Sequence, residues 1–340
     1  MHHRLRALTT ALTLLVALLI VAPAFAQQPT SVNPTASSVQ EQQLLRSLQS
    51  GAPGQGTTVS GRISIPDPKA ANLIQPQGQA WRAFHQGAMH WAGTIAIGGM
   101  IVLLAVFYFT RGRIMIEKGP SGVRILRFST FERFVHWMTA GCFLILALSG
   151  LNLTFGKFVL LPIFGPDAFT FVTQWGKYAH NYLAWPFMLG LLFMFMVWVA
   201  HNLPNKTDLD WIKAGGGLIT KGVHPPAKKF NAGQKVIFWS VIGGGAALSV
   251  SGVFLLFPFS AGGVLALQFW NIVHGLVAVI LTAIMIAHIY IGSVGMEGAA
   301  DAMTTGDVDL NWAKEHHSLW VEEEKAKGTI HPGAAVQPAE

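Results

Sequence analysis

Five long apolar stretches constrain this chain more than any other feature of its sequence. Each has about 20 residues or more, the length that an α-helix needs to cross the hydrocarbon core of a bilayer. They run over residues 90–110, 134–153, 179–200, 236–257 and 269–294. Because a backbone in lipid must satisfy its own hydrogen bonds, the pattern predicts an all-α membrane protein.

The composition agrees with this prediction. Hydrophobic residues make up 51% of the chain and charged residues 11%, whereas soluble domains have about 25% charged residues. The net charge of +7 does not indicate nucleic acid, because the basic residues fall in short loops between apolar stretches. The single cysteine, Cys142, cannot form an internal disulfide, hold an iron–sulfur cluster or attach haem covalently.

The N-terminus has the pattern of a secretory signal peptide. Arg4 and Arg6 precede an apolar core at residues 7–21 and a small-residue motif that ends at Ala26. We predict that residues 1–26 are cleaved off; an uncleaved signal anchor is the alternative. Residues 27–88 are rich in Gln, Ser, Gly, Pro and Thr, so we predict a low-complexity periplasmic arm.

Loop charge predicts the orientation in the membrane. Basic residues cluster after the first and third apolar stretches, are scarce after the second and are absent after the fourth. Loops rich in Lys and Arg stay in the cytoplasm. We therefore expect a multi-pass protein of the bacterial inner membrane, with a periplasmic N-terminus after cleavage and a cytoplasmic tail at residues 297–340.

Four histidines lie inside these stretches or at their ends. His274 and His288 are 14 residues apart on one predicted helix, a rise of about 21 Å, which is most of the bilayer core. The predicted orientation puts His180 at the periplasmic depth of His274, and His136 at the cytoplasmic depth of His288.

Imidazole is a good axial ligand for haem iron, and two imidazoles saturate the iron. The four histidines therefore predict two bis-histidine haems, suited to electron transfer more than to oxygen binding. A membrane anchor without haem, in which the histidines only pack helices, is the alternative.

Other residues near the predicted ligands allow two interpretations each. Arg133 lies one turn before His136, where it can neutralise a haem propionate or anchor the helix at the cytoplasmic face. Four glycines in the apolar stretches either admit a porphyrin plane close to the helix backbone or serve ordinary helix packing. These glycines are Gly141, Gly150, Gly190 and Gly275.

Residues 230–235 precede the fourth apolar stretch on the predicted cytoplasmic side. The amides of Asn231 and Gln234 can hydrogen-bond a quinone carbonyl, and Gly233 admits a flat ring close to the backbone. The same residues also predict a helix N-terminus capped by Asn231.

These motifs resemble the gamma subunit, cytochrome b556, of membrane-bound respiratory formate dehydrogenases. The resemblance covers about residues 125–320. It rests on Arg-Phe-Val-His-Trp at 133–137, Tyr-Ala-His at 178–180, Phe-Asn-Ala-Gly-Gln-Lys-Val-Ile-Phe-Trp at 230–239, the pair His274 and His288, and Trp-Ala-Lys-Glu-His-His at 312–317.

The resemblance implies two b haems, held by His180 with His274 and by His136 with His288. It implies reduction of a quinone, menaquinone or ubiquinone, near the cytoplasmic haem at Asn231 and Gly233. It also implies an iron–sulfur beta subunit as electron donor and a molybdenum or tungsten alpha subunit that oxidises formate, since this chain holds no candidate site for that reaction. The cytochrome b subunit of a nickel–iron hydrogenase or of a thiosulfate reductase is the alternative function.

The predicted architecture is a transmembrane four-helix di-haem bundle, residues 112–296, with one extra N-terminal transmembrane helix at residues 89–111. The signal peptide, the arm and the extra helix depart from the shortest members of the family that the chain resembles.

Overall fold

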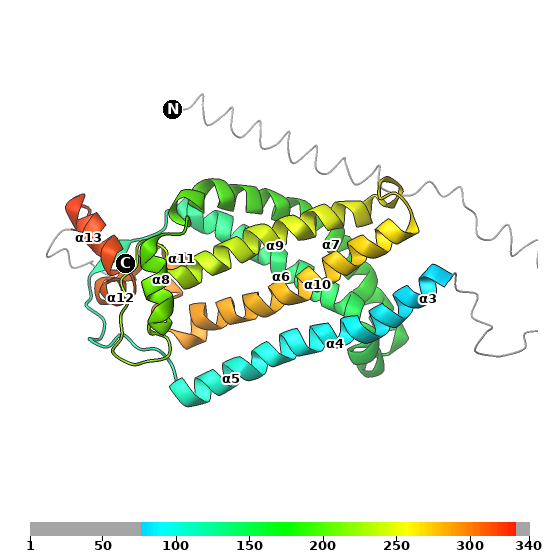
Figure 1. Ribbon diagram of the computed structural model, residues 1–340, viewed down its shortest axis with the longest axis horizontal. Coiled ribbons are helices and arrows are strands. Elements are labelled where there is room, and N and C mark those ends of the chain that lie inside the picture. Colours follow the sequence, from blue (N-terminus) through cyan, green and yellow to red (C-terminus); the bar gives the residue numbers. More distant parts are fainter. Residues whose placement is uncertain (1–75, 331–340) are drawn as a thin grey trace, which may run out of the picture. The chain divides into compact units, whose positions relative to one another are not determined.

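The computed structural model describes residues 76–330. The predicted signal peptide, residues 1–26, and the predicted arm up to residue 75 lie outside the described part. The chain divides into two units, Met1–Gln79 and Ala80–Glu340. The second unit consists of long helices and one two-stranded sheet (Figure 1).

A run of helical segments opens the described chain, with two π-helical turns inside it. The segments are α3 (Pro76–Ala83), η2 (Phe84–Ala88), α4 (Met89–Gly93), η3 (Thr94–Gly98) and α5 (Gly99–Arg111). Residues 76–88, which we expected to belong to the low-complexity arm, are therefore helical. Trp81 and Phe84 lie there among polar residues such as Arg82, His85 and Gln86, so the segment lacks the long apolar stretch from which the other helices were predicted.

Helices α6 (Thr130–Val159) and α7 (Leu161–Trp198) follow. The Ser129 hydroxyl accepts from the backbone N–H of Glu132, and the Glu132 carboxylate accepts from the backbone N–H of Ser129, so a capping box begins α6. Gly165, at φ 77°, breaks the helical backbone near the start of α7. Glycine adopts this left-handed conformation without strain, and the chain reverses direction there.

Cross-contacts show that α6 and α7 run side by side in opposite directions. Trp198, at the end of α7, donates from Nε1 to the carboxylate of Glu132, at the start of α6, over 2.9 Å. Farther along, Asn152 Nδ2 donates to Thr173 Oγ1 over 3.0 Å. The 72-residue apolar stretch Thr130–His201 thus contains two predicted spans folded back on each other.

Helices α9 (Ala232–Leu256) and α10 (Val264–Tyr290) form the second hairpin. Phe254 and Trp270 stack across its closed end, with ring centres 4.5 Å apart. The connection contains the 3₁₀ turn η6 (Pro258–Ser260), and the π-helical segment η7 (Ile291–Gly295) continues α10.

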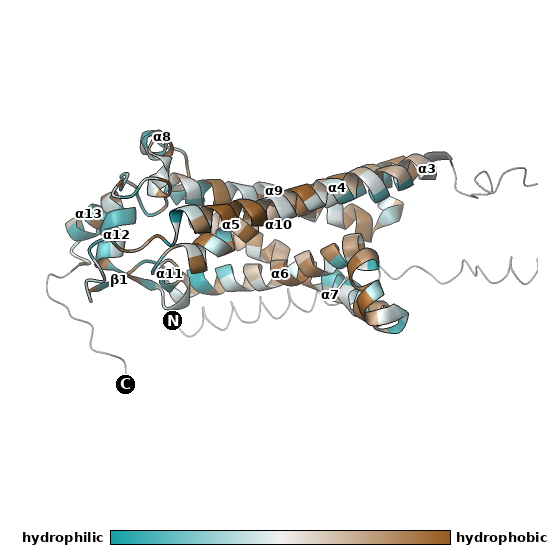
Figure 2. Ribbon diagram, turned by 90° about the horizontal axis from the view of Figure 1, so that it is seen from below, coloured by the Kyte–Doolittle hydropathy of each residue, from teal (hydrophilic) through white to brown (hydrophobic). Residues whose placement is uncertain are grey.

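Four helical stretches of the described chain are long and apolar enough to cross a membrane. They are Ala80–Arg111, Thr130–His201, Ala232–Leu256 and Val264–Gly295. Large apolar side chains on them are exposed, Phe109 to 84% and Leu148 to 67%, as expected for helices that lipid surrounds. Figure 2 shows apolar residues along the helices and many hydrophilic residues at the end that carries α8 and α12. The predicted fold class, an all-α membrane protein, is confirmed.

The hydrophilic segments at that end fold together into what we call the polar-end module, residues 112–128, 202–235 and 296–326. Strands β1 (Arg124–Leu126) and β2 (Asp307–Asp309) pair antiparallel in it. Its remaining elements are η4 (Val199–His201) at its border, α8 (Lys206–Lys213), η5 (Gly215–Gly217), α11 (Asp301–Thr304), α12 (Leu310–His316) and α13 (Ser318–Ala326).

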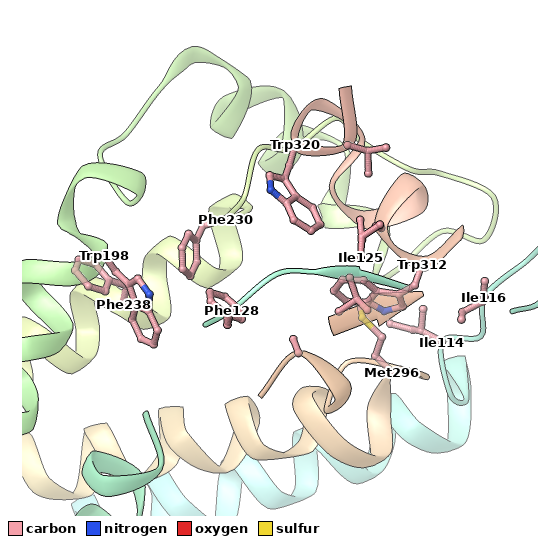
Figure 3. Close-up of a cluster of buried hydrophobic side chains, with 14 of the residues drawn as sticks. Ile114, Ile116, Ile125, Phe128, Trp198, Phe230, Phe238, Met296, Trp312 and Trp320 are labelled. Carbon is pink, nitrogen blue, oxygen red and sulfur yellow. The ribbon is translucent and has the colours of Figure 1, made fainter. Parts of the chain in front are cut away.

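The polar-end module has an apolar core of its own. Figure 3 shows Trp312 and Trp320 of the C-terminal helices around Ile125, and Phe128 beside Phe230. Phe128 and Trp312 are each 2% exposed. The tail is therefore not a solvated extension: up to residue 326 it packs on the loop that follows the first helix.

Candidate functional site

The four predicted ligands form two facing pairs in the bundle. His180 on α7 and His274 on α10 have ring centres 6.2 Å apart, with 58° between the ring planes. His136 on α6 and His288 on α10 have ring centres 6.3 Å apart, with 65° between the planes. These are the two pairs that depth matching predicted, and the described residues show no hydrogen bond between the rings of either pair.

The separation fits one metal ion between two imidazoles. Bonds of about 2 Å from a metal to one nitrogen of each ring, on opposite sides, place the ring centres about 6 Å apart. Ordinary ring–ring packing covers the same range of distances. The distance between ring centres therefore does not distinguish metal ligation from simple packing, and the hydrogen bonds of the rings are the further evidence.

Serine hydroxyls orient both rings of the first pair. Ser149 Oγ on α6 lies 2.8 Å from Nδ1 of His180, and Ser251 Oγ on α9 lies 2.9 Å from Nδ1 of His274. Each hydroxyl donates its own proton to the carbonyl four residues earlier in its helix, over 2.7 Å. The serine oxygen must then accept from Nδ1–H, which leaves the Nε2 lone pair of each imidazole for a metal.

This hydrogen-bonding pattern favours ligation. Metal-binding histidines regularly donate their second ring N–H to a fixed acceptor, which sets both the tautomer and the ring orientation. Neither serine was predicted from the sequence. Their signal is a repeated Ser-Gly pair, at residues 149–150 and 251–252, each on a helix that faces a predicted ligand.

The glycine of each pair makes room for the ring that the serine holds. A Cβ added at Gly150 would lie 3.7 Å from Cε1 of His180, and one at Gly252 would lie 3.3 Å from Cε1 of His274. The second distance is tighter than ordinary van der Waals contact. A side chain at position 252 would therefore press against the imidazole.

The second pair lacks a serine of this kind. Nδ1 of His136 is buried and has no hydrogen-bond partner among residues 76–330. Leaving such a group unsatisfied costs about 1–3 kcal/mol. The neighbouring Trp137 donates from Nε1 to the carbonyl of Met303 over 2.8 Å, so the polar-end module lies against the start of α6 beside this pair.

Arg133 also contacts the polar-end module. Its Nη1 donates to the carbonyl of Thr304 over 2.6 Å, and its Nε is buried without a partner in the described chain. The predicted contact with a haem propionate stays a prediction. The hydrogen bond to residue 304 gives Arg133 a second role, which is to hold the tail beside His136.

The other glycines that the sequence singled out differ in their surroundings. A Cβ at Gly190 would overlap Thr139, and a Cβ at Gly275 would overlap Met89, so these two serve close helix packing. No atom lies within 4 Å of a Cβ built at Gly141. Gly275 brings α4 of the extra helix against α10 directly beside His274.

The predicted quinone residues lie at the start of α9. Asn231 Oδ1 accepts from the N–H of Gln234 over 2.9 Å, and Gln234 Oε1 accepts from the N–H of Asn231 over 3.1 Å. The two side chains thus form a capping box. A Cβ at Gly233 would lie 2.9 Å from the ring of Trp211 on α8. The side-chain N–H groups of Asn231 and Gln234 remain available as hydrogen-bond donors, since no described residue accepts from them.

A small cavity borders Asn231. It measures about 20 Å³, and Trp211, Glu315 and His316 also line it. This volume holds about one water molecule. A quinone ring needs more space, so binding at Asn231 requires Trp211 or the neighbouring loop to move.

Two buried ionisable groups of the polar-end module, Arg127 and His317, were not predicted. Arg127 Nη2 lies 2.8 Å from His317 Nε2, and His317 Nδ1 donates to the carbonyl of Lys228 over 2.7 Å. Burial, with the Arg127 charge adding to it, holds the pKa of His317 well below 6.5, so its Nε2 accepts from the guanidinium. Burial lowers the pKa of Arg127 to about 9, which keeps it charged at neutral pH.

Comparison with known proteins agrees with the resemblance that the motifs indicated. A family model described as prokaryotic cytochrome b561 matches residues 127–306. The chain is 32% identical over 209 residues to the cytochrome b556(Fdn) subunit of the nitrate-inducible formate dehydrogenase of Escherichia coli, covering 60% of this chain and 93% of that protein. It is 32% identical over 202 residues to the cytochrome b556(fdo) subunit of an E. coli formate dehydrogenase, covering 58% and 92%. A formate dehydrogenase cytochrome b556 subunit of Haemophilus influenzae is 27% identical over 206 residues, covering 59% and 84%.

Proposed function

The chain belongs to the prokaryotic cytochrome b561 family, and from this membership we propose that it is the di-haem cytochrome b subunit of a membrane-bound formate dehydrogenase. In this role it anchors the complex in the bacterial inner membrane and connects a periplasmic iron–sulfur subunit with quinone. The observation that carries the proposal is the arrangement of two facing histidine pairs, 6.2 and 6.3 Å between ring centres, on the helices of one bundle.

Four histidines of this chain are the ligands that we propose for two haems. His180 and His274 would hold one haem through Nε2, with Ser149 and Ser251 fixing the tautomer. His136 and His288 would hold the other. When bound, b haems with two imidazole ligands supply one-electron carriers whose iron has no free position for oxygen.

The rest of the pathway follows from the predicted orientation. The His180–His274 pair lies on the predicted periplasmic side, where an iron–sulfur beta subunit would deliver electrons from a molybdenum or tungsten alpha subunit that oxidises formate. The His136–His288 pair lies on the cytoplasmic side, with Arg133 as a candidate partner for a haem propionate. The names of the relatives favour formate dehydrogenase over a nickel–iron hydrogenase or thiosulfate reductase as the parent complex.

Quinone reduction is assigned to the start of α9. The NH₂ groups of Asn231 and Gln234 can donate to a quinone carbonyl while their oxygens cap the helix. Gly233 would let the ring approach the backbone once Trp211 moves aside.

Haem analysis of the purified complex tests the proposal. We expect two b haems per chain and a b-type α-band in the reduced-minus-oxidised spectrum. His288→Ala should lose about half of the haem and all quinone reduction, because one ligand pair is broken. His85→Ala, on the extra helix, is the matched control and should keep both haems. A wild-type protein without haem, or full haem content in His288→Ala, would reject the assignment.

A further inference from the structure

We propose that His224 and His316 deliver protons from the aqueous surface of the polar-end module to a quinone at Asn231. The inference rests on the proposed function. Reduction of a quinone to a quinol takes two electrons from the subunit's donor and two protons, one for each carbonyl oxygen. Asn231 is half-buried and borders a small cavity of this module, so groups that line the cavity are placed to supply these protons.

The inner end of the route is His316. Its Nε2 is buried and has no hydrogen-bond partner among the described residues. The 20 Å³ cavity borders both His316 and Asn231. One water there would satisfy Nε2 and link it to the amide at the start of α9.

The outer end of the route is His224. Its side chain is 31% exposed, and its Nε2 lies 3.0 Å from a carboxylate oxygen of Glu117, which is itself 46% exposed. The ring centres of His224 and His316 are 6.3 Å apart, at 81° between planes. Rotation of one ring, or one water between them, completes the connection.

The groups around His316 determine its resting state. Burial comes first, and the charges of His224 and Arg127 add to it, in lowering the pKa of His316 to about 4. Glu315, beside it, is already an acceptor for the backbone N–H groups of Glu117 and Lys118. His316 is therefore neutral at rest, and a neutral imidazole passes a proton by accepting at one nitrogen and releasing from the other.

The ion pair of Lys235 with Asp208, at the start of α9, is not suited to this role. Lys235 Nζ donates to Asp208 over 2.9 Å and to the carbonyl of Leu203 over 2.9 Å. Its side chain is only 6% exposed. Both partners are held in a fixed buried ion pair that does not line the cavity.

The experiment uses the purified holo-complex with menadione as the quinone probe. The variants are His316→Gln and His224→Gln, because glutamine keeps a polar side chain that cannot carry a proton at neutral pH. His201→Gln, an exposed histidine at the same end of the bundle, is the control. Each variant is measured for haem content, haem reduction by dithionite, and menadione reduction from pH 6 to 8 in H₂O and D₂O.

In His316→Gln we expect menadione reduction at pH 7.5 to fall by about tenfold or more, with unchanged haem content and haem reduction. The solvent isotope effect should rise, and added imidazole should restore part of the rate. His224→Gln should lose activity mainly at high pH. If His316→Gln reduces menadione at the wild-type rate, the proton relay is wrong, while the proposed function still stands. If His316→Gln loses haem, His224→Gln takes its place, and a wild-type pH profile in His224→Gln would overturn the relay. A wild-type complex that reduces no quinone would overturn the relay together with the proposed function.

Discussion

The hydroxyl of Ser251 lies 2.9 Å from Nδ1 of His274 and donates its own proton to the carbonyl of Ala247. The imidazole must therefore be the donor in the Ser251–His274 hydrogen bond. Ser149, on another helix, accepts from Nδ1 of His180 and donates to a backbone carbonyl in the same way. Both candidate ligands of the first pair thus share one tautomer and one means of support.

Removal of either hydroxyl should raise the midpoint potential of the haem that we propose for this pair. An acceptor on Nδ1–H makes the imidazole a stronger donor to iron and so stabilises the oxidised state. Loss of a hydrogen bond of about 1 kcal/mol corresponds to a shift of up to about 40 mV. Redox titration of Ser149→Ala and Ser251→Ala measures it. Ser249→Ala is the control, because within residues 76–330 that hydroxyl bonds only to the carbonyl of Gly245; equal potentials in all three variants would contradict the role of the serines.

A valine at position 252 should displace the His274 ring. Even the Cβ would lie 3.3 Å from the imidazole, and the γ-methyl groups need more room. We expect Gly252→Val to lose the haem of this pair, seen as a fall of about half in haem per chain. Gly243→Val, on the same helix with no atom within 4 Å of its Cβ, should keep full haem content. Retention of both haems in the first variant would show that position 252 does not shape the site.

The extra helix should stabilise the first pair through Met89. This side chain is 4% exposed and lies against Gly275, next to His274. Met89→Ala would leave a cavity there, at a cost of about 2–5 kcal/mol. We expect a lower melting temperature for Met89→Ala, with the spectrum of this haem lost first on heating. Met115→Ala, at a side chain 53% exposed, should melt like the wild type; equal melting of both variants would argue against the contact.

Much of this architecture can be predicted from the sequence, for reasons that individual residues show. The apolar stretches and loop charges were enough to pair His180 with His274 and His136 with His288, because depth in a membrane depends on position along a helix. They could not find Ser149 and Ser251, which lie 31 and 23 residues from the histidines they contact. Those contacts depend on how each helix is rotated, and helices that are apolar on all sides give no signal of rotation.

The polar-end module was missed for a different reason. The sequence predicted residues 297–340 only as a cytoplasmic tail, yet His317 is fully buried against Arg127. The β-sheet pairs Arg124 with Asp309 across most of the bundle's sequence. Such long-range pairing cannot be predicted from local periodicity.

The polar-end module should lose stability as the pH falls below about 6.5. The pKa of His316 is lowered to about 4 and that of His317 lies well below 6.5, so between these values the unfolded chain binds protons that the folded module does not. His316 alone should cost about 1.4 kcal/mol for each pH unit between 6.5 and 4. Hydrogen exchange of residues 307–326 at pH 5 to 8 measures this. His316→Gln should flatten the profile, and protection that stays constant down to pH 5 would contradict the buried neutral state.

Each histidine pair has one histidine on α10, His274 in one pair and His288 in the other, and these two are 14 residues apart. Inserting a single residue between His274 and His288 would turn one of them about 100° around the helix axis and away from its partner. An insertion or deletion in this segment should therefore separate one histidine pair or the other. The connection at residues 258–263 lies outside the segment and can change in length. The number of residues between His274 and His288 is therefore fixed by the two pairs together, whichever side chains fill the segment between them.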